Sequence, residues 1–592
     1  MMPIKLKVTI ELLTPLHVGG DPGEDVNTSY ILRGADKQAY YPGTAFKGKV
    51  RHYALQLQKE LRQADCLFPE VCDCDVCRLF GGEGNARGSL FFSNFHTAGK
   101  QAIDLRAGNS IDRFRRVAED EKLFTTESAA ISALEGYITG NANEKDVDLL
   151  KASIKLIQQI GGNTSRGFGW VKGTIDVIVE DQPKEYVSGS DNRTISCVRV
   201  TLTPTSPLLI GTHTTQSNFR DTQFAIPGAV MRAAVARAIC EQDGTADPSE
   251  EGIENDLPTD METRFPNLRK AFSELRFSTL NADVQPMPFP ITTRKCKHHK
   301  KHRWVDALVA TLKDNDVKCS ECEMLKEKGR MDKVEPYEQV EDYLTNRKHP
   351  NALRMITSTH SETDKYRGTS RDGRLYTVRA IAPRAASFSG TINGSIDMKE
   401  LSSLLISPLR VGAMLTSGFG VCEVLPITID YEEPYNTMLE RIEEFNKLVG
   451  SSDIFVPITL MSDAIVKLKE PDDGDYIKAY EPLLNTVEDE PDFELESVLT
   501  KPRMWRGFDT SPRKREPEHY EKPARFLLQA GSVFVVRIRA KTLDSDSVEV
   551  EKLKRIEREG IGEERKDGYG AVRVAHENHI EITLAMKGGQ TQ

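Results

Sequence analysis

The sequence repeats one pattern, a strand followed by a turn, a helix and a glycine-rich loop. Near the N-terminus, apolar residues alternate from Ile4 to Leu12, as in a half-buried strand, and the turn 15–20 (PLHVGG) follows. Residues 40–44 open a predicted helix with Thr44 as its N-cap. Its apolar residues share one face: Phe46, Val50, Ala54, Leu57 and Leu61. The loop 161–170 (GGNTSRGFGW) then leads into a further alternating stretch, and the first unit ends near residue 180.

The same pattern occurs twice more. Residues 198–202 alternate, 207–211 (PLLIG) repeat the first turn, 225–229 open a second helix, and 410–421 contain a second glycine loop. A weaker third copy comprises 455–465, 531–534 and 560–572. This repeat is too long for a solenoid, so it predicts tandem domains of strand–helix–strand type. We expect a first domain over 1–180, a linker over 181–195, a second domain over 196–430, a connecting helix over 431–452 and a third domain over 453–592.

The composition is that of a folded globular protein. Hydrophobic residues make up 39% and charged residues 28% of the 592 residues. The formal net charge of −10 argues against indiscriminate nucleic-acid binding, so any site for a polyanion must be local. No apolar run approaches the roughly 18 residues of a membrane helix, and residues 1–14 do not resemble a signal peptide. We therefore expect a cytoplasmic protein without a membrane partner.

Seven of the ten cysteines fall into two groups, which points to metal binding. The first group is Cys66, Cys72, Cys74 and Cys77. Four thiolates can complete a tetrahedral zinc site with no open position, so we interpret this group as structural zinc. The alternatives are scattered thiols and a redox pair.

The second group combines Cys296, Cys319 and Cys322 with a nearby histidine. Three cysteines and one histidine are an ordinary set of zinc ligands. His302 is the preferred fourth ligand, although spacing alone leaves His298 and His299 open. The surrounding run 294–304 is the most basic in the chain; it is either a solvated face or a contact to RNA phosphates.

The glycine-rich loops precede strands, unlike those of dinucleotide folds. Glycines allow close approach of a ligand to the backbone, and beside Arg166, Arg565 and Lys566 they suit a sugar–phosphate backbone. The alternative is that each loop only turns the chain and buries its aromatic residue. The first Pro-Gly helix adds a possible phosphate seat at its N-terminus, with Lys47, Lys49 and Arg51.

These motifs resemble a known family. Residues 15–20 (PLHVGG), 41–51 (YPGTAFKGKVR), 77–81 (CRLFG) and 165–169 (SRGFG) are similar to the backbone subunits of type III (Csm/Cmr-type) CRISPR effector complexes, in the RAMP superfamily. Residues 196–580 resemble a Csx-type, III-D-like RAMP subunit related to the family that caps the 5′ tag of the guide. The motifs there are 226–228 (IPG), the second cysteine group, 375–376 (LY), 417–420 (SGFG), 505–508 (WRGF), 530–533 (AGSV) and 562–565 (GEER). The whole chain thus resembles a fusion of the two.

The resemblance implies an α+β fold of tandem ferredoxin-like (RRM-like) RAMP domains with zinc-binding insertions. It also implies binding of CRISPR guide RNA (crRNA) and target RNA, and assembly with other backbone RAMP subunits and a large polymerase-like subunit. Residues 111–114 with 123–124 resemble the hairpin thumb of the family, or form an ordinary amphipathic hairpin. The expected RNA-binding residues are Gly19, Gly20, Gly43, Lys47, Lys49, Arg51, Arg113, Arg166, Gly167, Phe168, Arg232, Gly418, Phe419, Trp505, Arg506, Arg565 and Lys566.

Catalysis is a separate question. Active members of the family carry an aspartate between the Gly-Gly turn and the Pro-Gly helix, where this sequence has Asn27. Asn is neither a base nor an anionic ligand, but Asp25 lies two residues upstream, so we name Asp25 as the candidate catalytic residue for target-RNA cleavage with Mg²⁺ or Mn²⁺. The later copies, with His213 and Asp221 in the equivalent segment, are expected to be non-catalytic.

Two alternatives to cleavage by Asp25 remain. One is a non-catalytic guide-binding scaffold. The other is a stand-alone RNA-processing nuclease that uses His17, His52 and His360 as acid–base groups, although a lone histidine is more often structural.

Overall fold

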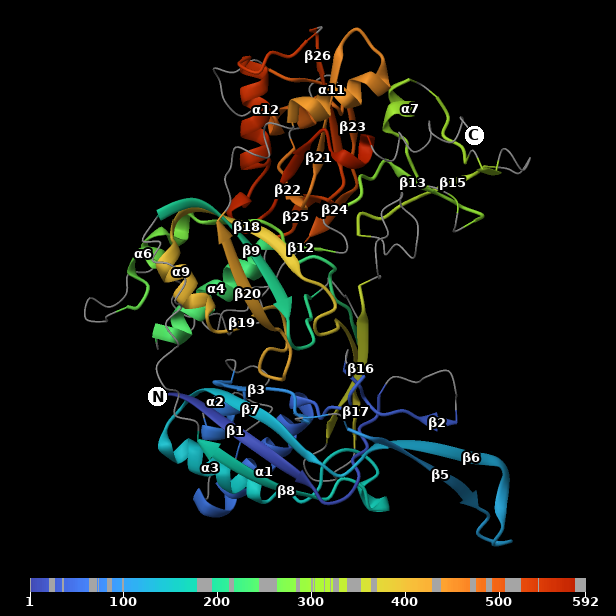
Figure 1. The fold of residues 1–592 in the computed structure, drawn as a ribbon, viewed down its shortest axis with the longest axis vertical. Coiled ribbons are helices and arrows are strands. Elements are labelled where there is room, and N and C mark those ends of the chain that lie inside the picture. The colour runs from blue at the N-terminus through green and yellow to red at the C-terminus, as the bar shows by residue number, and fades with distance from the viewer. Residues whose placement is uncertain are drawn as a thin grey trace.

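The computed structural model describes most of the chain. The described residues are 2–20, 27–34, 37–62, 66, 72, 74–81, 88–97, 99, 101–177, 194–211, 218–243, 263–283, 288–299, 302, 304–313, 315–319, 321–322, 329–337, 353–363, 370–428, 438–468, 475–485, 492–505, 523–540 and 542–580. They form three units, each built on an antiparallel sheet with helices packed against it (Figure 1). No helix in these ranges is long and apolar enough to cross a membrane.

The first unit has a four-strand main sheet of order β3-β7-β1-β8, with β4 also paired to β7. Its elements are β1 (Met2–Leu12), β2 (Thr28–Ser29), α1 (Gly43–Arg62), α2 (Asp75–Phe80), β3 (Leu90–Phe92), β4 (His96–Thr97), β5 (Ile103–Ile111), β6 (Ala118–Ala129), β7 (Ala133–Ala142), α3 (Glu144–Lys155), η1 (Thr164–Arg166) and β8 (Val171–Val177). All pairings of the main sheet are antiparallel, and the order corresponds to the βαββαβ arrangement of ferredoxin-like domains. Alternate residues of β1 (Leu6, Val8) and one face of α1 (Phe46, Val50) meet in its core, as the periodicity predicts.

The second unit repeats this order as β11-β18-β9-β20-β19, with β12 also paired to β18. Its elements are β9 (Thr194–Pro204), β10 (Phe219–Arg220), α4 (Gly228–Asp243), α6 (Pro266–Ala271), η2 (Phe272–Glu274), β11 (Arg276–Phe277), β12 (Asn281–Ala282), β16 (Met355–Thr363), β17 (Ser370–Ile381), β18 (Phe388–Asp397), α9 (Met398–Leu405), β19 (Leu409–Arg410) and β20 (Val421–Thr428). Helix α4 occupies the place that α1 has in the first unit.

The third unit has the order β23-β26-β21-β27, again antiparallel. Its elements are α11 (Met438–Val449), β21 (Ile454–Leu460), β22 (Ala464–Ile465), η3 (Lys478–Leu483), β23 (Glu494–Leu499), β24 (Pro502–Trp505), β25 (Arg525–Leu528), β26 (Val533–Ile538), α12 (Val548–Glu559), η5 (Arg565–Asp567) and β27 (Val572–Val574). Among its described residues, the first crossover holds the short 3-10 helix η3 where the other units have a long α-helix. The segment expected as a connecting helix, α11, packs on β21 and β27 and belongs to this unit's core.

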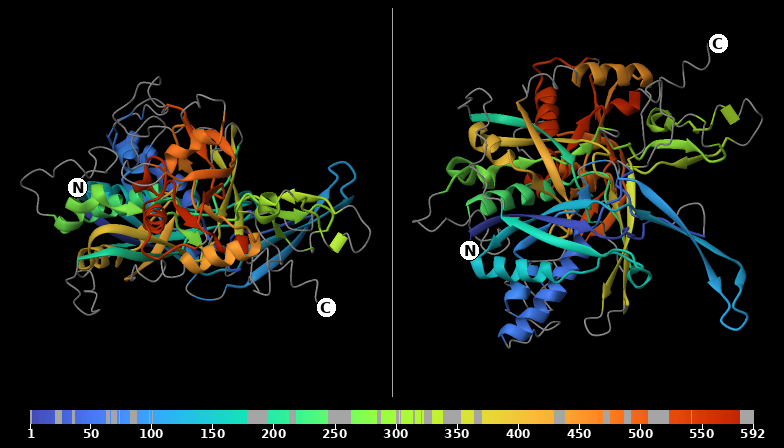
Figure 2. Two further views of the ribbon diagram at one scale, coloured as in Figure 1. Left: turned by 90° about the horizontal axis from the view of Figure 1, so that it is seen from above. Right: turned by 60° about the horizontal axis from the view of Figure 1, so that its bottom comes forward.

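Each unit also carries a small side sheet, with one short strand from the segment after its first main strand and two strands from the segment between its second and third main strands. These sheets have the orders β2-β6-β5, β10-β17-β16 and β22-β25-β24. The β5–β6 hairpin is the longest projection from the first unit and extends away from its main sheet (Figures 1 and 2). The hairpin β16–β17 is its counterpart in the second unit, since both pair in parallel with the short strand that precedes the main helix.

The three glycine-rich loops adopt the same backbone conformation. We call 161–169, 412–420 and 562–570 the first, second and third glycine loops. Their last glycines have φ of +71° at Gly169, +75° at Gly420 and +70° at Gly570. A Cβ at these positions would lie 1.9, 2.2 and 1.7 Å from a backbone carbonyl oxygen, so only glycine fits. The internal repeat predicted from sequence is therefore a repeat of conformation.

The second glycine loop docks on the first unit, where α1 begins. Asn94 Nδ2 donates to the carbonyl oxygen of Gly418 (3.1 Å), and Asn94 Oδ1 accepts from the backbone N–H of Gly43 at the start of α1 (2.9 Å). Lys47, one turn into α1, donates to Thr416 Oγ1 at 2.8 Å. This contact, the first joint, links the two units.

The third glycine loop docks on the second unit in the equivalent way. A Cβ at Gly568 would lie 2.6 Å from the carbonyl oxygen of Phe277, and a Cβ at Gly228, where α4 begins, 2.7 Å from that of Asp567. Arg232, one turn into α4, lies 3.6 Å from the Asp567 carboxylate. We call this contact the second joint. The units thus stack head to tail, each glycine loop on the helix N-terminus of the preceding unit.

The second cysteine group lies in a segment that folds against the third unit, although it interrupts the sequence of the second. The segment forms β13 (Thr293–Cys296), β14 (Val305–Asp306), α7 (Leu308–Leu312) and β15 (Met331–Lys333). Its Asp306 carboxylate is fully buried and contacts His579 Nδ1 at 3.0 Å, while His579 Nε2 and the Thr459 hydroxyl are 2.9 Å apart. A polar chain in the core thus fixes this insertion to β21.

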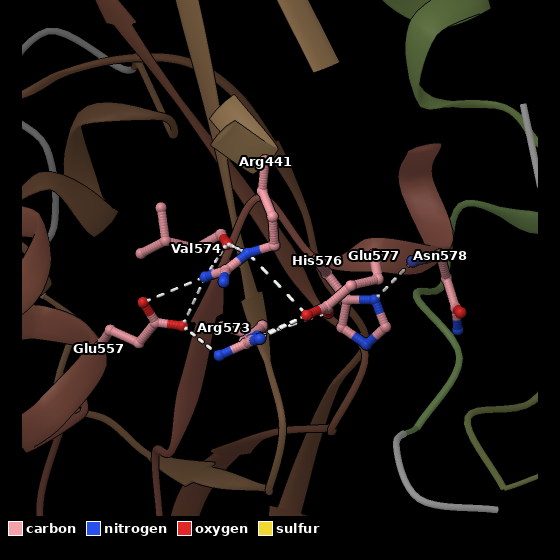
Figure 3. A network of polar contacts seen from close by, with 7 residues as sticks. All are labelled: Arg441, Glu557, Arg573, Val574, His576, Glu577 and Asn578. Carbon is pink, nitrogen blue, oxygen red and sulfur yellow. Dashed lines mark hydrogen bonds and ion pairs between the residues drawn. The ribbon is translucent and has the colours of Figure 1, made fainter. Parts of the chain in front are cut away.

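Buried charges hold the helices of the third unit against β27 (Figure 3). Arg441 of α11 donates to Glu557 Oε1 of α12 at 3.0 Å and to the carbonyl oxygen of Val574, and Arg573 donates to the same Glu557 oxygen at 3.0 Å. His576 lies beside this network and is fully buried; burial, followed by the charge of His579, lowers its pKa to about 3.

We predict that the third unit loses stability as the pH falls below about 6.5, the pKa of an unperturbed histidine. The unfolded chain then binds a proton at His576 that the folded chain does not, so stability is retained above pH 6.5 and lost toward pH 3. Urea unfolding of the full chain at pH 7 and 5.5 should show a lower midpoint for this unit at pH 5.5. The difference should shrink in His576→Gln but not in His52→Gln, which alters α1. An equal pH dependence in both variants would exclude His576 as its source.

Candidate nucleic-acid interface and metal centres

The first cysteine group comes together beside α2. One ligand atom from each of Cys66, Cys72, Cys74 and Cys77 lies within 4.8 Å of the others. Cys74 caps α2, and the backbone N–H of Cys77 donates to its sulfur at 3.4 Å. Burial, followed by the neighbouring thiols, raises the pKa of Cys77. A bound cation would stabilise the Cys77 thiolate. Four sulfur donors fit a closed zinc site, and this group can hold zinc.

The second group is formed by Cys296, His302, Cys319 and Cys322, again within 4.8 Å. His302 Nδ1 lies 3.3 Å from Cys319 Sγ and 3.4 Å from Cys322 Sγ, so it faces the site through Nδ1. The donor set fits tetrahedral zinc.

His298 and His299 take a different part in this site. Burial alone would raise the pKa of the Cys296 thiol, but backbone N–H groups of His299 and His298 donate to it, and the pKa is lowered. Such N–H···S bonds favour the thiolate that a metal needs. The structure thus places His302 with the three cysteines and uses the backbone of the other two histidines.

The β5–β6 hairpin presents arginines and apolar side chains to solvent. Phe114 at its tip is 99% exposed, and Asp112 accepts from the backbone N–H groups of Phe114 and Arg115, which shapes the turn. Further exposed residues along the hairpin are Leu105, Arg106, Ile111, Arg113, Arg116 and Leu123. Cationic and apolar side chains that are exposed together suit a ligand with both charge and flat apolar faces.

Gly20 and Asn27 flank the segment in which catalysis was predicted, and Asn27 pairs with the base of the hairpin. Asp25 lies outside the described residues, as do Asp21, Glu24 and, in the second unit, His213. On one side the backbone N–H of Gly20 donates to Tyr30 (2.9 Å), and Gly19 bridges to Ile31. On the other side the carbonyl oxygen of Asn27 accepts from Thr125 of β6 (2.9 Å). The described residues on either side of the acidic segment are therefore both held by backbone hydrogen bonds.

Glu127 of β6 organises this base and has no signature in the sequence. It accepts from the Arg33 guanidinium at 2.7 Å and from the backbone N–H of Ile31 at 3.1 Å. Its carbonyl oxygen lies 2.7 Å from Nδ1 of the buried His17, whose Nε2 lies 3.3 Å from the Ser29 hydroxyl. Both ring nitrogens of His17 thus have structural partners.

The other histidines proposed as acid–base groups lie in separate elements. His52 is on α1, where burial and Lys49 lower its pKa. His360 is on β16, stacks on Tyr376, and has its pKa lowered to about 4 by burial and Arg220. Within the described ranges no hydrogen bond joins two of these three histidines, so their arrangement does not favour the stand-alone nuclease.

The first glycine loop packs its side chains on the hairpin. Phe168 is buried beneath the Arg106 guanidinium (4.9 Å), and the Arg166 guanidinium lies over the Phe124 ring (5.5 Å). Gly167 has open space on the Cβ side. Two of the three predicted RNA contacts of this loop are thus exposed, and the aromatic residue serves packing.

Many of the other predicted RNA-binding residues contact a neighbouring unit. Gly43, Lys47 and Gly418 lie in the first joint and Arg232 in the second, as described above. Lys566 lies 3.2 Å from Glu274 across the second joint. Arg565 lies 3.7 Å from Glu559 of its own unit. Phe419 is buried against the side sheet of its own unit. The described contacts of these residues are within the chain.

The remaining predicted residues are more scattered. Arg51 reaches toward Cys77 Sγ (4.0 Å), and burial lowers the pKa of Lys49. Arg113 is exposed at the hairpin tip. Trp505 ends β24, and Arg506 lies outside the described residues.

A cavity of about 490 Å³ lies where the second and third units meet. Its lining mixes cationic with acidic side chains. The lining residues are Arg232, Arg276, Gly562, Glu563, Glu564, Arg565, Lys566 and Asp567. Only part of this charge was anticipated from sequence, since Arg276 belongs to no recognisable motif.

Comparison with known proteins agrees with this geometry for the first unit. Residues 9–172 match the model of the RAMP superfamily, from β1 into β8. The structure confirms the predicted α+β fold, and the RAMP match covers the first unit. No curated protein matches the chain.

We predict that the purified chain contains two zinc ions, one for each group. His302→Ala should remove about one of them, because it deletes a ligand. His299→Ala should keep both, because the backbone N–H that bonds Cys296 is retained and the His299 ring packs against His302 without belonging to the ligand set. Elemental analysis after extensive dialysis measures the content directly. Loss of metal in His299→Ala with full content in His302→Ala would reverse the assignment.

Proposed function

We propose that this chain is a subunit of a type III CRISPR effector complex that binds the crRNA, including its 5′ tag, and the target RNA. The RAMP match indicates a CRISPR-associated RNA-binding subunit. The type III assignment, the fusion with a tag-capping subunit, and assembly with further backbone subunits and a large polymerase-like subunit rest on the motif resemblance. A non-catalytic scaffold has the same binding function.

The observation that carries the proposal is the β5–β6 hairpin. Arg113 and Arg115 supply charge for phosphates, and Phe114 supplies an aromatic face for a base or a step in a duplex. Positive charge is concentrated at the tip of the hairpin, so RNA can bind there although the net charge of the chain is −10. Recognition through the backbone and shape of the RNA leaves the sequence to be read by base pairing.

The cavity between the second and third units supports the tag-binding part of the proposal. The guanidinium groups of Arg276 and Arg565 suit the phosphates of a single-stranded tag, and Lys566 adds a further cation. Glu563 and Glu564 can accept hydrogen bonds from base or ribose donors.

Replacement of Arg113 and Arg115 by Ala should weaken binding of a guide–target RNA duplex by roughly tenfold at low salt and reduce the salt dependence, because fewer phosphate contacts release counterions. Filter binding of the full chain over a salt series measures both. The matched control is Lys399→Ala with Lys447→Ala, which removes the same charge from α9 and α11. A similar loss in the control would mean that total charge, not the hairpin, determines binding.

We further propose that Asp25 takes part in cleavage of the target RNA. Gly20 and Asn27, the described residues on either side of 21–26, are hydrogen-bonded, and Asn27 pairs with β6 of the hairpin that would contact the target. A carboxylate there can accept a proton from a 2′-hydroxyl or hold Mg²⁺ or Mn²⁺, which Asn27 cannot do.

In the reconstituted complex with a matched guide and divalent metal, Asp25→Ala should abolish one cut of the target ladder and leave the cuts at other subunits intact. Filter binding should show unchanged affinity, and Asn27→Ala serves as the neighbouring control. An unchanged ladder in Asp25→Ala would make the chain a guide-binding scaffold.

A further inference from the structure

Of the three glycine loops, two are covered by a neighbouring unit, and no other unit covers the first one within the part of the chain that the structure describes. Gly167, Gly418 and Gly568 occupy the same place in their loops, with φ of +89°, +86° and +83°. Gly418 and Gly568 are buried in the joints, whereas Gly167 is exposed and nothing lies within 4 Å of where its Cβ would be. The first glycine loop therefore has the conformation of the two loops that form joints, but among the described residues no acceptor helix packs on it.

Each joint needs the same acceptor, the start of a helix opened by Pro-Gly. In the first joint Gly43 opens α1 and in the second Gly228 opens α4. Both acceptors are already filled by this chain's own second and third loops. The third unit has no equivalent long helix among its described residues. A second copy of this chain therefore has no vacant acceptor of this kind to offer.

We propose that the first glycine loop docks on the Pro-Gly helix N-terminus of a separate polypeptide with the same βαββαβ fold, and so extends the stack at this end. This inference rests on the proposed function, because it names the partner of an effector subunit. It assigns the exposed face of 165–167 to a protein contact and not to RNA. In both internal joints a glycine loop packs on the start of one helix of the preceding unit. The same geometry at the first glycine loop accommodates one partner, which would precede the first unit in the stack.

Charge in the loop restricts which helix fits. Arg166 stands where the third loop has Asp567, and Asp567 faces the cation Arg232 one turn into its acceptor helix. The first acceptor has the cation Lys47 at the same place. A partner for Arg166 should instead carry an acidic or neutral residue one turn after its Pro-Gly glycine, because two cations in contact repel.

The test uses the full chain, its guide RNA and a separately purified RAMP-fold backbone subunit of the same complex. A photo-crosslinking benzoylphenylalanine replaces Ser165, and the crosslinked peptides are mapped. In parallel, Gly167→Asn adds bulk to the loop; Asn tolerates a left-handed backbone and the space is open, so the free chain should fold normally. Gly450→Asn is the matched control, since Gly450 also has positive φ (+68°) and open surroundings but follows α11.

We expect the crosslink at the start of the partner's Pro-Gly helix. Gly167→Asn should weaken subunit binding by about tenfold or more in sedimentation velocity, with Gly450→Asn within about twofold of wild type. A crosslink to the guide RNA, a crosslink elsewhere on the partner, or unchanged binding by Gly167→Asn would overturn the inference. A chain that binds neither guide RNA nor the subunit would refute the proposed function itself, which the other outcomes do not.

Discussion

The close approach of a glycine loop to the start of a helix is the contact on which the arrangement of the chain depends. In both joints the backbone of the loop meets backbone or amide groups of the preceding unit where a Cβ would not fit. The loop must hold glycine at positive φ, at Gly418 and Gly568, to make this approach. The glycine that opens each acceptor helix is required first by its own unit, since a Cβ at Gly43 would lie 2.6 Å from the carbonyl oxygen of Ser93 and one at Gly228 would lie 2.0 Å from that of Phe277.

This use of the loops changes where RNA can be expected. Lys47 and Arg232, one turn into equivalent helices, had the appearance of phosphate ligands, but their described contacts hold the next unit. What stays exposed is the β5–β6 hairpin, with Phe114 at its tip, and the cavity between the second and third units. The units thus supply a rigid stack, and the projecting side sheets supply the surface for a ligand.

Much of the fold could be predicted from sequence because its signals are local. Alternation identified β1, the apolar face identified α1, and spacing identified both cysteine groups. The joints could not be predicted, because Asn94 and Gly418 are far apart in sequence and an isolated Asn carries no signal. The same holds for the insertion that folds on the third unit through Asp306 and His579. Spacing also left His298, His299 and His302 open as the fourth ligand of the second cysteine group, and the structure brings His302 together with the three cysteines.

The central claim is that the second and third glycine loops join the units independently of RNA, and that the β5–β6 hairpin contacts the guide–target duplex. Hydrogen–deuterium exchange of the full chain, with and without a CRISPR guide paired to its target, tests it most directly. The account predicts that amides of 412–420 and 562–570 are protected without RNA, and that 103–129 gains protection when RNA is added. Protection of the two loops only in the presence of RNA, with no change in the hairpin, would contradict it.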